Sequence, residues 1–219
     1  MNTSKRIILA IVFCGAVALS FVPVKAQGDK TPTPAQIPQT DQKETYDALV
    51  KRVKGGDLKV DFGAMRQAYT ETPGFSGYGN SGKYEMYGAL NQKKFKDALS
   101  LAEKRLEKVY VDLNGHYVAM IANSELKQSD KAEFHRQVFL GLVDSIVRGH
   151  DGLTPATAYD VISIDEEKLV ISYLGFEFSG SQALVQDSGH AYDRMGVTDS
   201  KTKTNSALYF RIDRFFGKF

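Results

Sequence analysis

The stretch HAYDRMGVTDSKTKTNSALYFRID, residues 190–213, predicts a β-hairpin whose strands, His190–Thr198 and Asn205–Asp213, are joined by the polar turn DSKTKTN. Successive side chains of a strand point to opposite faces, so apolar residues that alternate mark the buried face. The apolar positions that share this face are Ala191, Met195, Val197, Leu208, Phe210 and Ile212. The hairpin is therefore expected to press one face against a core and to leave the other polar.

The register of this hairpin determines which polar side chains meet. Matching the two faces across the turn pairs Asp199 with Thr204. On the polar face this register predicts three facing pairs: His190 with Asp213, Tyr192 with Arg211, and Arg194 with Tyr209. Asp193 is expected on the buried side. A His–Asp pair beside a Tyr–Arg pair suits acid–base chemistry or the binding of a small polar ligand, and such pairs also occur on an ordinary solvated sheet face.

The rest of the strand-rich half, residues 151–219, predicts one more strand, a short β-like run and a helix. The strand is expected over Phe176–Gln186 and the β-like run over Tyr159–Ile164. Between them, Asp165-Glu166-Glu167 is expected to begin a helix that reaches Leu174. Acidic residues at a helix start complement the helix dipole, which is the simplest interpretation of this acidic triplet.

Residues 43–150 predict a helical half. Apolar residues recur at helical spacing in two short segments, 46–53 and 62–69, and then in four longer ones. The four are expected over Tyr84–Gln92, Phe95–Tyr110, Leu113–Leu126 and Lys131–Arg148. Their run KKFKDALSLAEKRLEKVYVDLNGHYVAMIANSELKQSDKAEF loosely resembles tetratricopeptide repeats, without the terminal proline or the Trp/Gly/Tyr signature positions. The resemblance implies a concave helical face that binds a peptide or protein segment.

A glycine-rich loop, PGFSGYGNSGK, separates the short helices from the long ones and carries the aromatic residues Phe75 and Tyr78. Two interpretations are open. The loop is either a long connection that its aromatic side chains hold to the surface, or an aromatic-bearing lid over a binding site. It lacks the GxGxxG and P-loop spacings, so it does not predict a phosphate site.

Residues 1–26 predict a cleaved secretory signal, because Lys5 and Arg6 lead into an apolar run that closes on Val24-Lys25-Ala26. The run is too short to span a bilayer comfortably. Residues 27–42 contain three prolines and little to bury, and they predict a disordered linker. The protein is therefore expected to be periplasmic or secreted, with no membrane insertion after the signal is cleaved.

The predicted mature chain narrows the possible function classes. Its only cysteine, Cys14, is removed with the signal, which leaves 193 residues with no disulfide, zinc-thiolate site or cysteine nucleophile. Three cations are removed too, so the formal net charge changes from +2 to −1 and gives no electrostatic case for nucleic acid or an anionic membrane.

Catalytic and metal-binding motifs are also missing. His116, His135 and His150 lack the spacing of a metal site and are expected to be surface or packing residues. The chain has no GxSxG serine motif and no cofactor fingerprint. We therefore expect no metal and no cofactor.

Three stretches together resemble a known family. They are HYVAMIANSELKQSDKAEFHRQVFLGLVDSI, DGLTPATAYDVISIDEE, and HAYDRMGVTD with LYFRIDRFFG. They are similar to the bacterial exported family called domain of unknown function 4919, over about Tyr46 to Phe219. The resemblance implies a Bacteroidetes-type exported protein. The family carries no assigned activity, so the resemblance implies no catalytic residue.

These patterns together predict an α+β protein in which a short tetratricopeptide-like helical array packs on a small, mostly antiparallel sheet. The expected function is that of a non-catalytic periplasmic or secreted binding protein. Its partner is expected to be a peptide or protein of the cell envelope, or a small polar ligand. The helical groove, the aromatic loop and the polar sheet face are the candidate binding surfaces, and the oligomeric state is left open.

Two alternatives remain. One is a hydrolase-like enzyme centred on His190 and Asp213, with Tyr192 and Arg211 orienting the ligand. It requires the His–Asp pair to line a pocket bordered by a second element such as the loop 151–154, whereas a binding protein requires an apolar groove among the helices. The other is a structural partner in an envelope complex, which requires an exposed apolar patch without a pocket.

Overall fold

The computed structural model describes residues 44–78 and 82–218, and these described residues belong to one compact unit. The predicted signal, with Cys14, and the predicted linker lie outside the described residues. In the part that the structure describes, no helix is long and apolar enough to cross a membrane.

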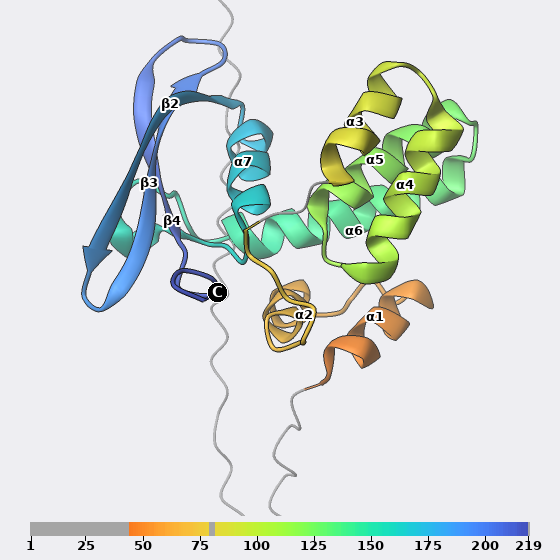
Figure 1. Ribbon diagram of the computed structural model, residues 1–219, viewed down its shortest axis with the longest axis horizontal. Helices are drawn as coiled ribbons and strands as arrows, with labels where there is room; N and C mark the ends of the chain where they lie inside the picture. The colour runs from red at the N-terminus through yellow and green to blue at the C-terminus, as the bar shows by residue number, and fades with distance from the viewer. Residues whose placement is uncertain (1–43, 79–81, 219) are drawn as a thin grey trace, which may run out of the picture. The chain divides into compact units, whose positions relative to one another are not determined.

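The described residues contain seven α-helices and one short 3-10 helix (Figure 1). They are α1 (Tyr46–Lys54), α2 (Phe62–Tyr69), α3 (Gly82–Asn91), α4 (Phe95–Lys108), α5 (Leu113–Glu125), α6 (Ser129–Val147), η1 (Pro155–Thr157) and α7 (Ile164–Tyr173). Every predicted helix is confirmed, with small shifts at the ends. Side-chain caps begin four of the α-helices, because Thr45, Asp61, Asp112 and Ser163 each accept a hydrogen bond from the backbone amide three residues on.

Helices α3 to α6 form the predicted helical array, in which each helix packs against the next along the chain. Small buried residues, Ala98 and Ala102 of α4 and Ala119 and Ala122 of α5, allow the helices to approach closely. Helix α2 packs on α6, and α5 also contacts α7. The array is thus connected to both the N-terminal helices and the strand-rich half, while the tetratricopeptide resemblance itself stays a prediction.

The sheet has four strands in the order β1-β4-β3-β2. They are β1 (Tyr159–Asp160), β2 (Phe176–Asp187), β3 (His190–Asp199) and β4 (Asn205–Arg211). Only the pairing of β1 with β4 is parallel, so the sheet is mostly antiparallel, as predicted. The predicted hairpin register is confirmed, because Tyr192 faces Arg211, Arg194 faces Tyr209, and the Asp199 amide donates to the Thr204 carbonyl at 2.9 Å.

Two predicted strand boundaries are wrong. The β-like run expected over Tyr159–Ile164 is a strand only at its first two residues. It ends early because Ser163 caps α7, with its hydroxyl accepting from the Glu166 amide at 3.3 Å. The last strand ends at Arg211 instead of Asp213, because the chain turns just after it and the Phe215 and Phe216 amides donate to the Ile212 carbonyl.

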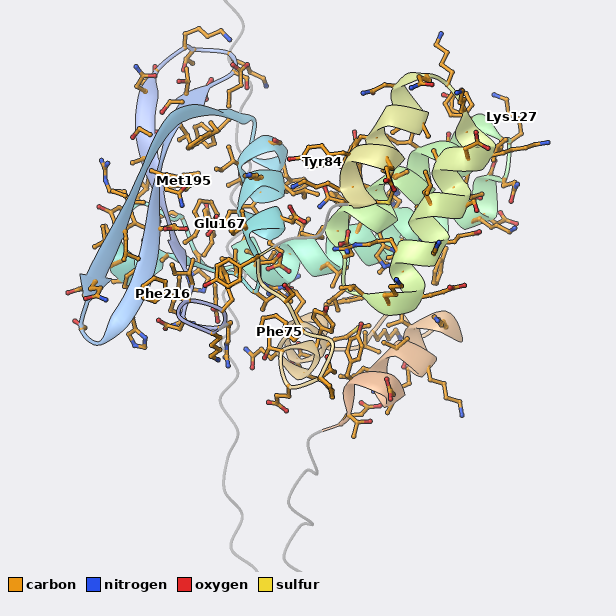
Figure 2. All side chains as sticks on the ribbon, viewed as in Figure 1. Phe75, Tyr84, Lys127, Glu167, Met195 and Phe216 are labelled. Atoms are coloured by element: carbon orange, nitrogen blue, oxygen red, sulfur yellow. The ribbon has the colours of Figure 1, made fainter. Side chains whose placement is uncertain are left out.

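One continuous apolar core joins the helical and strand-rich halves, and it includes Met65, Leu142, Ile171 and Phe210. Helix α7 packs against β2. Figure 2 shows Glu167 on the side of α7 that faces the sheet, toward Met195. The sheet face that carries the predicted apolar residues is therefore covered by α7 and the core.

A buried ion pair reinforces this junction. Arg66 of α2 and Glu166 of α7 are 3% and 4% exposed. The guanidinium donates to both carboxylate oxygens, at 2.8 and 2.6 Å, and also to the Asp160 carbonyl at 2.8 Å. Glu166 additionally accepts from the Ile162 amide at 2.8 Å. The two charged side chains thus bond to each other and to backbone groups of the segment before α7.

Candidate functional site

A groove of about 660 Å³ lies between α3, α5, α6 and α7, and we call it the aromatic groove. Its rings are Tyr84, Tyr87, Tyr117, Phe139 and Tyr173. Its polar lining residues are Lys83, Asn91, Asn114, Asp165, Lys168 and Ser172. The volume falls within the range of about 300–1,000 Å³ that is typical of small-molecule sites.

Four of the rings form a continuous row along the groove. The ring centroids of Tyr87 and Tyr117 are 6.3 Å apart, those of Tyr117 and Phe139 5.8 Å, and those of Phe139 and Tyr173 6.1 Å. Tyr84 stands apart from this row and is 74% exposed, and Tyr173 is 47% exposed. The groove therefore offers a mutually supported aromatic surface together with two rings that a ligand can cover.

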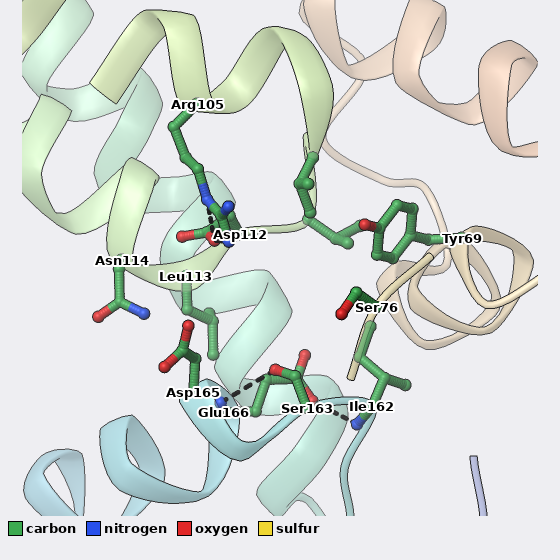
Figure 3. Close-up of a pocket in the computed structure, with 12 residues that line it drawn as sticks. Tyr69, Ser76, Arg105, Asp112, Leu113, Asn114, Ile162, Ser163, Asp165 and Glu166 are labelled. Atoms are coloured by element: carbon green, nitrogen blue, oxygen red, sulfur yellow. Dashed lines mark hydrogen bonds and ion pairs between the residues drawn. The ribbon is translucent and has the colours of Figure 1, made fainter. Parts of the chain in front are cut away.

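Asp165 and Asn114 line both the aromatic groove and a small internal cavity of about 30 Å³ (Figure 3). Lys83 donates to one carboxylate oxygen of Asp165. The other oxygen, Oδ2, is buried and has no hydrogen-bond partner among the described residues. Tyr87 donates to Asn114 Oδ1 at 3.0 Å, which leaves the Asn114 amide N–H groups to face other partners. An unused acceptor thus lies close to a donor where the two hollows meet.

The lining of the internal cavity mixes polar and apolar groups, and its polar part includes an ion pair. Arg105 is paired with Asp112, to which its Nε donates at 2.7 Å, and its Nη1 has no partner among the described residues. Figure 3 shows this pair across the cavity from Asp165 and Glu166. The volume suits one or two water molecules, which need about 10–15 Å³ each and several polar partners. The cavity is therefore suited to water, and the groove to a ligand.

The pairs predicted on the sheet face are present, but they do not form an open ligand-binding surface. His190 Nδ1 lies 2.6 Å from Asp213 Oδ2, and both line a hollow of about 410 Å³ with Asp187, Ser188 and Phe216. The loop 151–154 does not border this hollow. Burial opposes ionisation of Asp213, but hydrogen bonds from the Ala191 amide and from His190 outweigh it and keep the pKa of this carboxyl below its usual value.

The remaining side chains of the sheet face are engaged with one another. Tyr192 is only 5% exposed, in contrast to the open polar face that the sequence predicts; its ring packs edge-on against His190, and Arg211 is its cross-strand neighbour. Arg211 donates to Asp160 of β1 at 2.7 Å. Arg194 lies over the ring of Tyr209, 6.0 Å from its centroid. These residues stabilise the sheet face, and Arg211 is already neutralised.

The aromatic residues of the glycine-rich loop hold its described part to the body of the protein. Phe75 packs edge-on against Tyr69, with ring centroids 5.6 Å apart. Tyr78 packs edge-on against Phe215 and donates to its carbonyl at 3.1 Å. The Gly77 carbonyl accepts from the Ile164 amide at 2.9 Å. These contacts support the interpretation of the loop as a connection; residues 79–81 lie outside the described residues.

The chain matches the model of a known protein family. The family model "Domain of unknown function (DUF4919)" matches residues 35–218. The chain belongs to the DUF4919 family. No match was found among the curated proteins or among the solved structures. In this DUF4919 chain, the sequence predicted a groove among the helices but not which residues line it. The available signal was that Tyr84 and Tyr87, three residues apart, lie on one helical face.

The DUF4919 chain also contains a histidine pair that the sequence did not predict. His116 of α5 is fully buried, and its Nδ1 lies 3.0 Å from Nδ1 of His135 on α6. His116 Nε2 lies 2.8 Å from the Tyr110 carbonyl and must donate to it, so its Nδ1 accepts from His135. Burial lowers the pKa of His116 to about 3 and that of His135 to about 4. No group of three or more metal-ligating side chains occurs within residues 44–78 and 82–218.

This pair predicts a loss of stability in acid. Both pKa values are lower in the folded state than the ordinary histidine value of 6.5, so stability is full above pH 6.5 and falls as the pH drops toward 4. For buried His116 the slope is about 1.4 kcal/mol per pH unit. His135→Asn retains a donor and removes one titrating ring, so urea unfolding between pH 7 and 4.5 is expected to show a shallower acid slope. Equal slopes for the two proteins would rule the pair out as the cause.

Proposed function

We propose that this DUF4919 protein is a non-catalytic binding protein, exported from the cytoplasm, whose ligand occupies the aromatic groove. The observation that carries the proposal is the ligand-sized aromatic groove, one of whose lining residues, Asp165, has a buried carboxylate oxygen, Oδ2, without a partner among the described residues. Buried polar groups are rarely left unpaired, because desolvation costs about 1–3 kcal/mol. A bound ligand or water supplies the missing donor.

The arrangement of the groove supports binding more than catalysis. Burial raises the pKa of the Tyr87 hydroxyl, so this phenol stays protonated and acts as a hydrogen-bond donor to Asn114. Asp165 is held by Lys83. The lining residues therefore present donors, acceptors and rings that suit the positioning of a ligand, and the Ser172 hydroxyl donates to the Lys168 carbonyl at 3.1 Å instead of to a catalytic base.

Ligand binding can be tested through stability. A ligand that binds only the folded state raises the melting temperature, Tm. Fractions of the cell envelope of the native host are expected to include one that raises the Tm of the wild-type protein by several degrees and leaves that of Tyr84→Ala unchanged. Tyr84 is 74% exposed, so its removal is not expected to disturb the fold.

The matched control is Phe178→Ala, because Phe178 is an exposed aromatic residue on β2, away from the groove. It is expected to respond like the wild-type protein. A stabilising fraction that acts equally on Tyr84→Ala would place the ligand elsewhere and contradict the proposal.

A hydrolase-like site is the second candidate, because the His190–Asp213 pair lines a hollow of about 410 Å³ that also contains the Ser188 hydroxyl. Ser188 donates to Asp187 at 3.3 Å, and no hydrogen bond links it to His190 among the described residues. Turnover of any ester, amide or glycoside substrate that His190→Ala and Ser188→Ala both abolish would favour this candidate over the binding proposal.

A further inference from the structure

We propose that the ligand of the aromatic groove is a carbohydrate, bound as a neutral oligosaccharide segment. This inference rests on the proposed function and names the class of ligand for the same site. It depends on three properties of the groove: its exposed tyrosine rings, the presence of both an unused acceptor and a donor in its lining, and its mixture of positive and negative charges.

The rings fit the apolar side of a sugar. The two exposed tyrosines, Tyr84 on α3 and Tyr173 on α7, come from different helices that line the groove. An aromatic face carries negative charge density, and it attracts the weakly positive C–H groups that cover one face of a pyranose ring. Tyrosine also keeps a hydroxyl at its tip, which can bond a sugar oxygen while the ring packs.

The polar groups fit sugar hydroxyls. Asp165 is 7% exposed and Asn114 is 8% exposed, and both lie at the junction of the groove with the internal cavity. Asp165 Oδ2 needs a donor, whereas the Asn114 amide nitrogen offers one. A hydroxyl group donates and accepts at once, so neighbouring hydroxyls of one sugar ring can satisfy both residues.

The charges of the groove disfavour ionic ligands. Lys83 and Lys168 bring two ammonium groups, and Asp165 brings one carboxylate. A cationic ligand would be repelled by the lysines, and the anionic group of a ligand brings no donor for the buried oxygen of Asp165 that lacks one. A lipid tail would leave that oxygen buried and unpaired. A neutral ligand with many hydroxyl groups avoids all three penalties.

An extended peptide fits less well. The walls of the groove are helices, whose backbone N–H and C=O groups are used within the helix. A peptide would therefore find no strand edge to pair with and would depend on side chains alone. A sugar carries its apolar face and its hydroxyls on one rigid ring, so it loses less conformational freedom on binding.

The test is isothermal titration calorimetry of the purified protein against a panel of neutral oligosaccharides, acidic oligosaccharides and a random peptide library. At least one neutral oligosaccharide is expected to bind. Tyr84→Ala is expected to weaken that binding about tenfold, and Tyr84→Phe, which keeps the ring, to weaken it much less. Asp165→Asn is expected to weaken it by a similar factor, and Phe178→Ala to leave it unchanged.

The other outcomes separate this inference from the proposed function. Binding of a peptide but of no oligosaccharide, with loss in Tyr84→Ala, would refute the carbohydrate and keep the groove as the binding site. Oligosaccharide binding that Tyr84→Ala leaves intact would refute the carbohydrate inference for this groove. If neither class binds and no envelope fraction raises the Tm, both proposals are wrong.

Discussion

Arg66→Ala is expected to lower the free energy of unfolding by about 3–5 kcal/mol, a large part of the roughly 5–15 kcal/mol that stabilises a typical domain. The reason is the buried carboxylate of Glu166, which would lose its ion partner while remaining out of contact with water. The variant also deprives the Asp160 carbonyl of its donor. Urea unfolding at pH 7 measures the effect.

Arg52 of α1 is a matched control, because it forms exposed ion pairs with two carboxylates, those of Asp57 and Glu44. Arg52→Ala is expected to change stability little, because water screens exposed ion pairs. The double variant Arg66→Met, Glu166→Gln is expected to lose less than Arg66→Ala, since no charge is left buried. Equal effects of Arg66→Ala and Arg52→Ala would show that the buried pair does not hold α2 to α7.

Glu167→Gln is expected to stabilise the protein above neutral pH. Glu167 is fully buried on α7, and burial, together with the neighbouring carboxylates of Asp193 and Glu166, raises its pKa to about 9. Its two oxygens have no partner among the described residues, so the protonated form is the one that the fold accepts. The amide of glutamine has a similar shape and stays neutral at every pH.

The sign of the pH dependence follows from the raised pKa. The folded state keeps the proton of Glu167 up to about pH 9, whereas the unfolded chain releases it above the ordinary glutamate pKa of 4.5. The stability from this group is therefore full below pH 4.5 and falls as the pH rises toward 9. At pH 8 the glutamine variant is expected to be about 2–4 kcal/mol more stable than the wild type, and at pH 4.5 the two should be nearly equal.

Both histidines and Glu167 together predict a maximum of stability near pH 6.5. As the pH falls below 6.5, the loss from the two histidines outweighs the gain from Glu167, and as the pH rises above 6.5, the loss from Glu167 dominates. Glu167→Gln should flatten the alkaline side of the curve and steepen the acid side between about pH 4.5 and 6.5, where Glu167 opposes the histidines. A variant that shifts the whole curve by a constant amount would mean that Glu167 is not the titrating group.

Much of the fold could be predicted because its signals are local. The alternation of apolar and polar residues in 190–213 predicted the hairpin and its register, and with them the contact of His190 with Asp213. Helical spacing predicted all four long helices. The β-like run at Tyr159–Ile164 failed because the Ser163 cap competes with the strand, and a cap outweighs weak strand propensity.

The candidate site was much less predictable. The acidic triplet 165–167 resembled an ordinary helix start, yet each member has a different tertiary role: Asp165 lines the groove with Lys83, Glu166 pairs with Arg66, and Glu167 is buried beneath the sheet. In the same way, the rings of the groove are spread over four helices between positions 84 and 173. No local pattern connects them.

The sequence by itself determined the elements and the pairing of the last two strands, because helical and strand periods and turn lengths act over a few residues. It also determined that the chain belongs to the DUF4919 family. Only the tertiary structure decided which side chains share a groove and which charges are buried. Those properties depend on how elements far apart in the chain pack, and burial, not residue type, sets the pKa values of His116 and Glu167.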